Sequence, residues 1–275
     1  MNAGLGRNAP LRDNCNAILE TQALSKSFGG FRAVNQVSLR VTEGMIHALI
    51  GPNGAGKTTV FNLLTKFLRP SLGRILYRGQ DITRLKPAEI ARRGIARSFQ
   101  ISAVFPHLSV LENVRVAMQR ETGWSFHFWR PERSLARLDE RALTLLAEVG
   151  LADFAHRPAG SLSYGRKRAL EIATTLALEP QLLLLDEPMA GMGHEDVERT
   201  ARLIRKASQN RTVLMVEHNL KVVANLSDRI TVMQHGEILT EGSYAEVSRN
   251  PDVIRAYMGA GTQHGMHSDE RSADA

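Results

Sequence analysis

The sequence GPNGAGKT at residues 51–58 decides how the rest of the chain is interpreted. It matches the pattern G-x-x-x-x-G-K-[ST], it follows the apolar run 45–50, and it precedes a helical pattern that starts near Lys57. Glycines allow a tight turn that brings backbone N–H groups close to phosphate oxygens, and the next helix directs its positive end to the same place. The motif therefore predicts a loop that binds nucleotide phosphates.

The polar side chains of this motif have separate roles. Lys57 brings a full positive charge to the β- and γ-phosphates, and the hydroxyl of Thr58 is a ligand for Mg²⁺. A nucleoside triphosphate with Mg²⁺ is the expected ligand. The residues that we expect to bind it here are Gly51, Pro52, Asn53, Gly54, Ala55, Gly56, Lys57, Thr58 and Thr59.

A second motif, LLLLDE at residues 182–187, ends an apolar strand pattern in two adjacent carboxylates. Asp186 stands at the end of the strand, where it can reach Mg²⁺ directly or through water. Because successive side chains of a strand alternate, Glu187 faces elsewhere, toward an attacking water. His218 follows another apolar run, 212–216, at the sheet edge where ligands collect in α/β proteins. We expect these residues to complete the site around the phosphate loop.

The hydrophobic pattern predicts an α/β fold. Runs 46–50, 182–185 and 213–216 are almost wholly apolar, which is typical of strands buried on both faces of a mostly parallel sheet. Turn residues at 29–30 and 43–44 favour an antiparallel edge for the early strands. Further strands are expected at 33–41, 74–77 and 229–233, and helices after Gly56 and over 109–120, 135–149, 164–178 and 194–208.

Composition excludes several classes of protein. The chain has 275 residues, of which 43% are hydrophobic and 23% charged, so wholesale disorder is excluded. The net charge of +7 suits an anionic partner, although the basic residues are spread along the chain. The single cysteine, Cys15, cannot form an internal disulfide. Because neither a signal peptide nor a run of about 18 apolar residues is visible, we expect a cytoplasmic protein.

The sequence LSYGR at residues 162–166, about twenty residues before Asp186, completes a resemblance to a known family. From about residue 17 to 259, the chain resembles the ATP-binding subunit of an ABC transporter. The resemblance implies a P-loop NTPase fold with a RecA-like core, an antiparallel β edge and a helical subdomain at about 87–178. We expect residues 1–16 and 260–275 to be a flexible leader and tail.

The resemblance also implies roles for individual residues. Phe28 is similar to the aromatic residue that stacks on adenine, His218 to the switch histidine that contacts the γ-phosphate, and Gln100 to the glutamine that couples the metal site to the membrane subunit. Two such subunits would close on each other. Ser163 and Gly165 of one subunit would then bind the γ-phosphate of the ATP held by the other. The implied cofactors are ATP and Mg²⁺. The implied catalytic residues are Glu187, His218 and Gln100, and the implied metal ligands are Thr58, Gln100 and Asp186.

Three positions depart from the family pattern. Tyr164 stands in place of a glycine and Arg166 in place of a glutamine, and Gly193 stands where an aspartate is expected. Tyr164, the sequence FWRP at 128–131 and the ending 250–259 resemble branched-chain amino acid importers in particular. Related importers for urea, short amides or aromatic acids are the alternative.

The implied partners are a second ATP-binding subunit, identical or paralogous, and two membrane-spanning permeases that dock near residues 101–108. A solute-binding protein would take part indirectly. The expected location is therefore the cytoplasmic face of the inner membrane, as a peripheral protein.

Other functions remain as alternatives at this stage. A soluble ABC-type ATPase acting on ribosomes or DNA would use the positive charge directly, and the aromatic sequence at 123–131 could stack on bases. Such proteins carry two ATP-binding modules or long coiled-coil arms, whereas this chain has one phosphate loop and no sustained heptads. We therefore expect no nucleic-acid partner. The LSYGR motif and His218 disfavour a phosphotransferase outside the family, and Lys57, Asp186 and Glu187 disfavour a catalytically silent scaffold.

Overall fold

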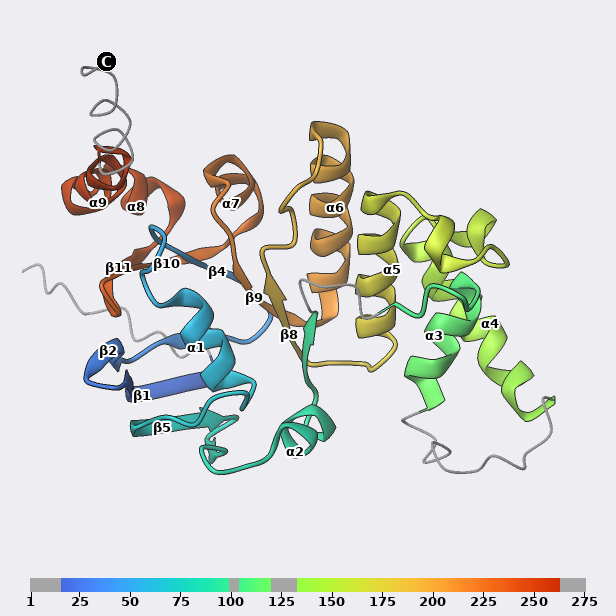
Figure 1. Ribbon diagram of the computed structural model, residues 1–275, viewed down its shortest axis with the longest axis horizontal. Coiled ribbons are helices and arrows are strands. Elements are labelled where there is room, and N and C mark those ends of the chain that lie inside the picture. The colour runs from blue at the N-terminus through green and yellow to red at the C-terminus, as the bar shows by residue number, and fades with distance from the viewer. Residues whose placement is uncertain (1–15, 99–103, 120–132, 263–275) are drawn as a thin grey trace, which may run out of the picture.

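The computed structural model describes residues 16–98, 104–119 and 133–262, with side chains in the last range from 138 to 257. In this part of the chain, helix α1 (Lys57–Leu64) lies between two β-sheets (Figure 1). Its buried residues, among them Val60, Phe61 and Leu64, share one hydrophobic core with residues of both sheets. The helix that follows the phosphate loop is therefore held from both sides.

The larger sheet is mostly parallel, as the sequence predicts. Its described strands run in the order β11-β10-β4-β9-β8-β7, and every neighbouring pair is parallel except β10 and β11. The strands are β4 (Ile46–Ile50), β7 (Ile95–Ser98), β8 (Leu182–Asp186), β9 (Thr212–Val216), β10 (Arg229–Gln234) and β11 (Glu237–Gly242).

The smaller sheet is antiparallel and confirms the expected edge. It contains β1 (Ala17–Phe28), β2 (Phe31–Val37), β3 (Arg40–Thr42), β5 (Leu72–Tyr77) and β6 (Gln80–Asp81). The sequence pattern did not predict β1, although it has 12 residues. The reason is that the strand is irregular: its pairing with β2 and β5 shifts register, and Ala23 has a φ of 45°. Such bulges interrupt the alternation by which strands are identified.

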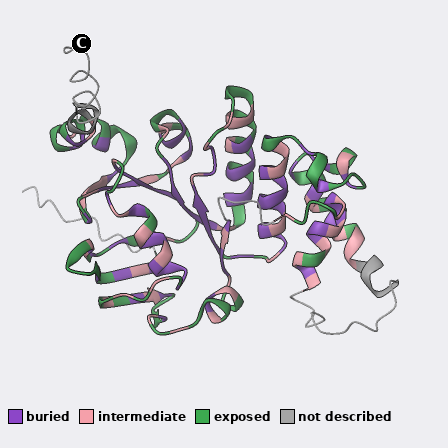
Figure 2. Cartoon of the chain, viewed as in Figure 1, coloured by how far each residue is buried: buried purple, intermediate pink, exposed green. Residues whose placement is uncertain are grey.

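The strands of the parallel sheet are largely buried (Figure 2). Their side chains belong to two hydrophobic cores, one on each face of the sheet. Leu182 and Leu184 pack with α1 and the antiparallel sheet, whereas Leu183 and Leu185 pack with the helices of the opposite face. Because successive side chains point to opposite faces, a strand that is buried on both sides must be apolar throughout.

The helices confirm the predicted pattern to within a few residues. The expected helices are α1, α3 (Val110–Gln119), α4 (Arg133–Glu148), α5 (Tyr164–Leu176) and α6 (His194–Ala207). The remaining α-helices of the described ranges are α2 (Pro87–Arg92), α7 (Leu220–Leu226), α8 (Tyr244–Arg249) and α9 (Pro251–Thr262). Within the range 87–178, β7 is a strand of the large sheet. The helical part is thus α3 to α5, while the subdomain boundary itself stays a prediction.

Candidate functional site

The predicted site residues follow three neighbouring strands and lie at one edge of the parallel sheet. β9 lies between β4 and β8, and all three run in the same direction. Their carboxyl ends therefore bring together the loop 51–58 after β4, Asp186 and Glu187 at the end of β8, and His218 after β9. Ligands of open α/β sheets bind at this edge.

Two glycines of the loop are required by the contacts that they make. Gly51 has a φ of 147°, and a Cβ there would lie 2.1 Å from the carbonyl oxygen of Met233 in β10. Gly56 has a φ of 98°, and its Cβ would lie 2.6 Å from the carbonyl oxygen of Ala33 in β2. The loop backbone is thus packed directly against both sheets, so only glycine fits at either position.

Lys57 is buried at the start of α1, and its ammonium is hydrogen-bonded within the loop. Nζ donates to the carbonyl oxygen of Gly51 at 2.7 Å and to that of Pro52 at 2.9 Å. Burial lowers the pKa of Lys57, while the nearby charges of Glu187 and Asp186 raise it. The predicted phosphate-binding cation therefore faces the two predicted acids across the site.

The start of α1 is open to a ligand. Gly56 is its N-cap and has no side chain that could bond the first N–H groups, and Thr58 in the first turn is exposed. Helix N-termini with free N–H groups attract phosphate. The exposed first turn and the uncapped helix end are compatible with the motif, while phosphate and Mg²⁺ binding there stays a prediction.

Asp186 is buried and paired with a residue that the sequence analysis missed. Nη2 of Arg97, in β7, lies 2.5 Å from Oδ2 of Asp186. Nη1 of Arg97 also donates to Oδ1 of Asn62 in α1 at 2.7 Å. Arg97 thus connects β7 and α1 to the predicted metal ligand and restricts the orientation of the carboxylate. Only the pairing of neighbouring strands could have revealed this contact.

Glu187 directly follows β8 in an unusual backbone conformation. Its φ is 44°, and its N–H donates to the carbonyl oxygen of Val216 in β9 at 3.0 Å. A positive φ at a residue other than glycine is uncommon and clusters at functional sites. The side chain is half-buried, and its charge acts on Lys57. Its position therefore suits the predicted role.

A buried carboxylate next to His218 is a second residue that the sequence analysis missed. Oε1 of Glu217 accepts from the N–H of Met189 at 3.0 Å, and Oε2 accepts from those of His218 at 3.1 Å and Asn219 at 3.4 Å. Burial raises the pKa of Glu217, and these three bonds oppose that rise. Glu217 thus joins the loop after β8 to the loop after β9 and leaves His218 exposed at the edge.

Phe28 lies at the end of β1, in a hairpin with β2. Phe28 is 43% exposed, its backbone pairs with that of Phe31 across the turn, and Nζ of Lys26 lies 5.1 Å from its ring centroid. β2 also carries Ala33, against which Gly56 packs. The structure therefore places an exposed aromatic ring on the strand pair that borders the loop, as adenine stacking requires.

Ser163 and Gly165 begin α5, which packs on α3 and α6 rather than beside α1. Ser163 is exposed, whereas Gly165 is packed so closely that a Cβ would lie 2.5 Å from the carboxylate carbon of Asp196. These residues are thus presented by the helical layer. Because Ser163 and Gly165 lie apart from the phosphate loop of their own chain, the arrangement is consistent with the prediction that they act on a nucleotide held by a second subunit.

Two of the departures from the family pattern have local partners. The hydroxyl of Tyr164 donates to the carbonyl oxygen of Ala190 at 3.1 Å, and the guanidinium of Arg166 lies 4.1 Å from the ring centroid of Phe154. Gly193 is the N-cap of α6, a position where an aspartate would be favourable. Nothing in the structure explains the glycine there.

Some predicted residues lie outside the described ranges. Gln100, residues 101–103 of the docking segment 101–108 and the aromatic sequence 123–131 are affected. Residues 104–108 of the docking segment are described, and Phe105 among them is exposed. The roles predicted for these segments stay predictions.

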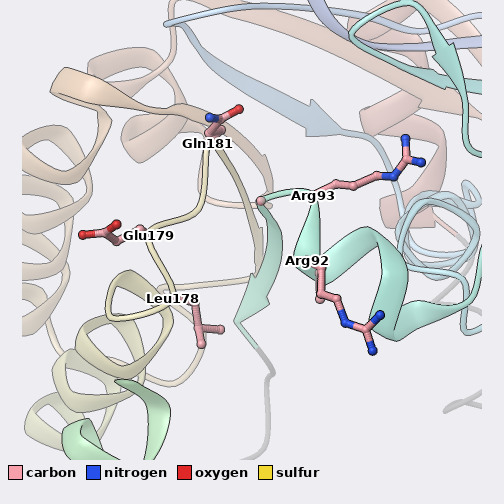
Figure 3. Close-up of a pocket in the computed structure, with 7 residues that line it drawn as sticks. Arg92, Arg93, Leu178, Glu179 and Gln181 are labelled. Carbon is pink, nitrogen blue, oxygen red and sulfur yellow. The ribbon is translucent and has the colours of Figure 1, made fainter. Parts of the chain in front are cut away.

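A cavity of about 420 Å³ lies at the opposite edge of the sheet (Figure 3). It is formed by the end of α2 and by the chain between α5 and β8, including Arg92, Arg93 and Glu179. The N–H groups of Gln181 and Leu182 close this edge by donating to the carbonyl oxygen of Gly94 at 2.9 and 3.0 Å. Because it lies where β8 begins, the cavity is separate from the predicted site.

Known proteins resemble this chain along most of its length. An ABC transporter profile matches residues 34–190, and a profile of branched-chain amino acid ATP-binding cassette transporters matches residues 237–262. The chain is 42% identical over 252 residues to the high-affinity branched-chain amino acid transport ATP-binding protein BraF of Pseudomonas aeruginosa, covering 88% of this chain and 98% of that protein. It is 43% identical over 249 residues to LivG of Salmonella typhimurium, another protein of that description, with the same coverage.

Solved structures agree with these sequence relationships. The ADP conformation of an ATP-binding cassette of an ABC transporter superposes with a TM-score of 0.77 and 30% identity, covering 88% of this chain and 99% of that one. Among the described residues, no helix is both long and apolar enough to cross a membrane. The chain belongs to the ABC transporter family, as an ATP-binding cassette that hydrolyses ATP.

Proposed function

We propose that this chain powers an importer of branched-chain amino acids. The observation that carries the proposal is the match of residues 237–262 to the branched-chain amino acid transporter profile, because this segment lies beyond the part matched by the general profile. The segment comprises β11, α8 and α9. Val253 of α9 belongs to the hydrophobic core that contains Ile50, and Tyr257 packs against this core. The C-terminal segment therefore shares a core with β4, the strand that leads into the phosphate loop.

The residues at the loop edge fit ATP with Mg²⁺. The close packing of Gly51 and Gly56 leaves the loop backbone to line a phosphate site. The hydroxyl of Thr58 and the carboxylate of Asp186 are oxygen ligands, which Mg²⁺ prefers. Gln100 would be a further ligand. When bound, Mg²⁺ would neutralise charge on the β- and γ-phosphate oxygens.

Separate residues of this chain bind the phosphates, orient the metal ligand, activate the attacking water and bind adenine. Lys57 exchanges its bonds to the carbonyl oxygens of Gly51 and Pro52 for bonds to the phosphates. Arg97 holds the carboxylate of Asp186 in orientation. Glu187 orients the attacking water and accepts its proton, while the exposed side chain of His218 contacts the γ-phosphate. Phe28 stacks on adenine.

A second ATP-binding subunit completes the site. Ser163 and Gly165 of a second copy, or their counterparts in a paralogue, bind the γ-phosphate from the opposite side and exclude water. Two permease subunits dock near residues 101–108 and a solute-binding protein delivers the solute. The complex holds this chain at the cytoplasmic face of the inner membrane.

Uptake measurements test the proposal. In cells that lack this chain, we expect uptake of labelled leucine, isoleucine and valine to be lost and to return with the wild-type chain. Glu187→Gln should not restore it, since removal of a catalytic base slows ATP hydrolysis by about 10²- to 10⁴-fold. Glu148→Gln, an exposed position at the end of α4, is the matched control and should restore uptake.

Two outcomes would contradict the proposal in different ways. If only uptake of urea, a short amide or an aromatic acid depends on this chain, the proposed solute is wrong and the transport role stands. If no uptake depends on it and the purified chain's ATPase is stimulated by RNA or DNA, the importer role is wrong.

A further inference from the structure

A second cavity, of about 460 Å³, lies beyond the far end of α1. It is formed where the loop after α1 meets the start of β5 and the turn before α2. Lys66, Arg69, Arg84 and Lys86 line it, and no acidic residue does. Four cations thus surround one cavity although they come from separate segments of the chain.

These four side chains form no ion pair with a carboxylate of the described residues. Two acids of the neighbouring segments, Asp81 and Glu89, accept hydrogen bonds in local turns. Oδ1 of Asp81 accepts from the N–H of Thr83 at 2.8 Å, and Oε2 of Glu89 accepts from that of Lys86 at 2.7 Å. Asp81 and Glu89 keep their negative charges, but two carboxylates balance only part of the charge of four cations.

Lys66 is the most unusual of the four. It is only 8% exposed, its Nζ has no hydrogen-bond partner, and its φ is 64°. Burial lowers its pKa to about 8, against an opposing effect of Asp81. Both the left-handed backbone and the buried charge are unfavourable, and such features persist where they serve a function.

The wall of the cavity is firmly held. Gly73 packs so closely on β1 that a Cβ would lie 2.5 Å from the carbonyl oxygen of Ala23. Nζ of Lys26 donates to the carbonyl oxygen of Arg69 at 2.9 Å, and Oγ of Ser71 accepts from the N–H of Ser27 at 3.2 Å. The hydroxyl proton of Ser71 is therefore left to donate to a ligand.

We propose that this cavity binds a phosphate group, carried either by a small soluble anion or by an anionic lipid headgroup. A phosphate offers several acceptor oxygens and up to two negative charges, which match several cations at once. A single carboxylate would balance only one of them. The site is distinct from the phosphate loop, because α1 separates Lys66 from Lys57, and it does not depend on the proposed function.

Lys66→Gly is the decisive variant, because glycine accepts the backbone conformation at this position. We measure thermal unfolding and calorimetric binding in sodium phosphate against sodium chloride of equal ionic strength, and cosedimentation with phosphatidylcholine vesicles with and without phosphatidylglycerol. Lys57→Ala removes the main cation of the phosphate loop. Lys206→Ala, an exposed lysine on α6, controls for the loss of one charge.

Binding of phosphate or the anionic vesicles at this cavity should be kept in Lys57→Ala and Lys206→Ala. In Lys66→Gly the affinity should fall about tenfold or more, as expected for the loss of one charge-assisted bond, and Arg84→Ala should weaken it as well. Without phosphate, Lys66→Gly should unfold at a higher temperature than the wild type.

The two probes distinguish the sources of the phosphate group. A Lys66-dependent response to free phosphate indicates a small anion, and one confined to the anionic vesicles indicates a lipid. If neither probe binds, or if Lys66→Gly binds both as well as the wild type, the proposal is wrong. A response lost in Lys57→Ala but kept in Lys66→Gly would assign all binding to the phosphate loop and would also overturn it.

Discussion

The two ends of α1 both carry a buried lysine, and the two lysines differ in what surrounds them. Lys57 starts the helix and bonds to the carbonyl oxygens of Gly51 and Pro52. Lys66 follows its end and has no hydrogen-bond partner at Nζ. Burial lowers the pKa of both. Burial alone therefore does not distinguish a recognised site from an unrecognised one.

The difference lies in where the neighbours come from. The partners of Lys57 stand five and six residues away, inside one motif, so the sequence reveals them. The cations around Lys66 include Arg84 and Lys86, which the turn after β6 brings to it. No local pattern connects them. A contiguous motif can be found by reading, whereas a site assembled from separate segments cannot.

The largest expected effect separates the two lysines by function. Lys57→Ala should lower kcat/KM for ATP by about 10³-fold, since a preorganised donor to the developing charge is lost. Lys66→Gly should leave kcat/KM unchanged. Steady-state ATPase kinetics with a coupled assay measure both. If Lys66→Gly lowers kcat/KM as much as Lys57→Ala does, the two ends of α1 belong to one site and the contrast fails.

A third buried base sharpens the contrast, because burial makes it resist protonation until the pH is well below the ordinary value for histidine. His47 in β4 has its pKa lowered from 6.5 to about 4, mainly by burial. Its Nε2 lies 2.8 Å from Oγ1 of Thr231, which donates to Oε2 of Glu241 at 2.9 Å. Because the Thr231 proton is used there, Nε2 of His47 is the donor, and the lowered pKa keeps the ring neutral near pH 7.

The folded-state pKa of His47 lies below its unfolded value, so the unfolded chain binds the extra proton first. Stability from this group is complete above about pH 6.5 and is lost as the pH falls toward 4. The loss amounts to about 3 kcal/mol of unfolding free energy. Urea unfolding at several pH values measures it, and His47→Gln should show a correspondingly flatter profile. Parallel profiles for both proteins would show that His47 does not titrate in this way.

The smallest expected effect tests whether the nucleotide site at the start of α1 includes Phe28. Phe28 lies on the hairpin that borders Gly56, and loss of one aromatic contact with adenine costs about 1 kcal/mol. Phe28→Ala should therefore weaken ATP binding by about fivefold, measured by calorimetry. Phe31→Ala, in the same hairpin, is the matched comparison and should change affinity less. Equal affinities for wild type and Phe28→Ala would remove Phe28 from the site.

Much of the fold could be predicted from hydrophobic pattern. The strands 46–50, 182–185 and 213–216 were recognised because burial on both faces leaves no polar position. β1 was missed because its bulges break the alternation, and β7 because it is short and carries Arg97 among small residues. Strand pairing then placed the predicted loop, acids and histidine at one edge.

The candidate site was predicted only in part. Residues that belong to contiguous motifs, such as Lys57 and Asp186, were found where the structure places them. Arg97 and Glu217 were missed, because their contacts join strands that are distant in the sequence. The functional roles of the predicted residues stay predictions for the experiments above.

The amino-acid sequence alone determined the phosphate loop, because its geometry depends on glycines and one lysine that are contiguous in the chain. It also determined the family through the LSYGR motif and the carboxylates at 186–187. The tertiary structure alone decided which side chains meet across strands and turns: Arg97 with Asp186, Glu217 with the Met189 backbone, and Lys66 with the other cations of its cavity. The physical reason is that charge and hydrogen bonding act over a few ångströms of space, whatever the separation along the chain.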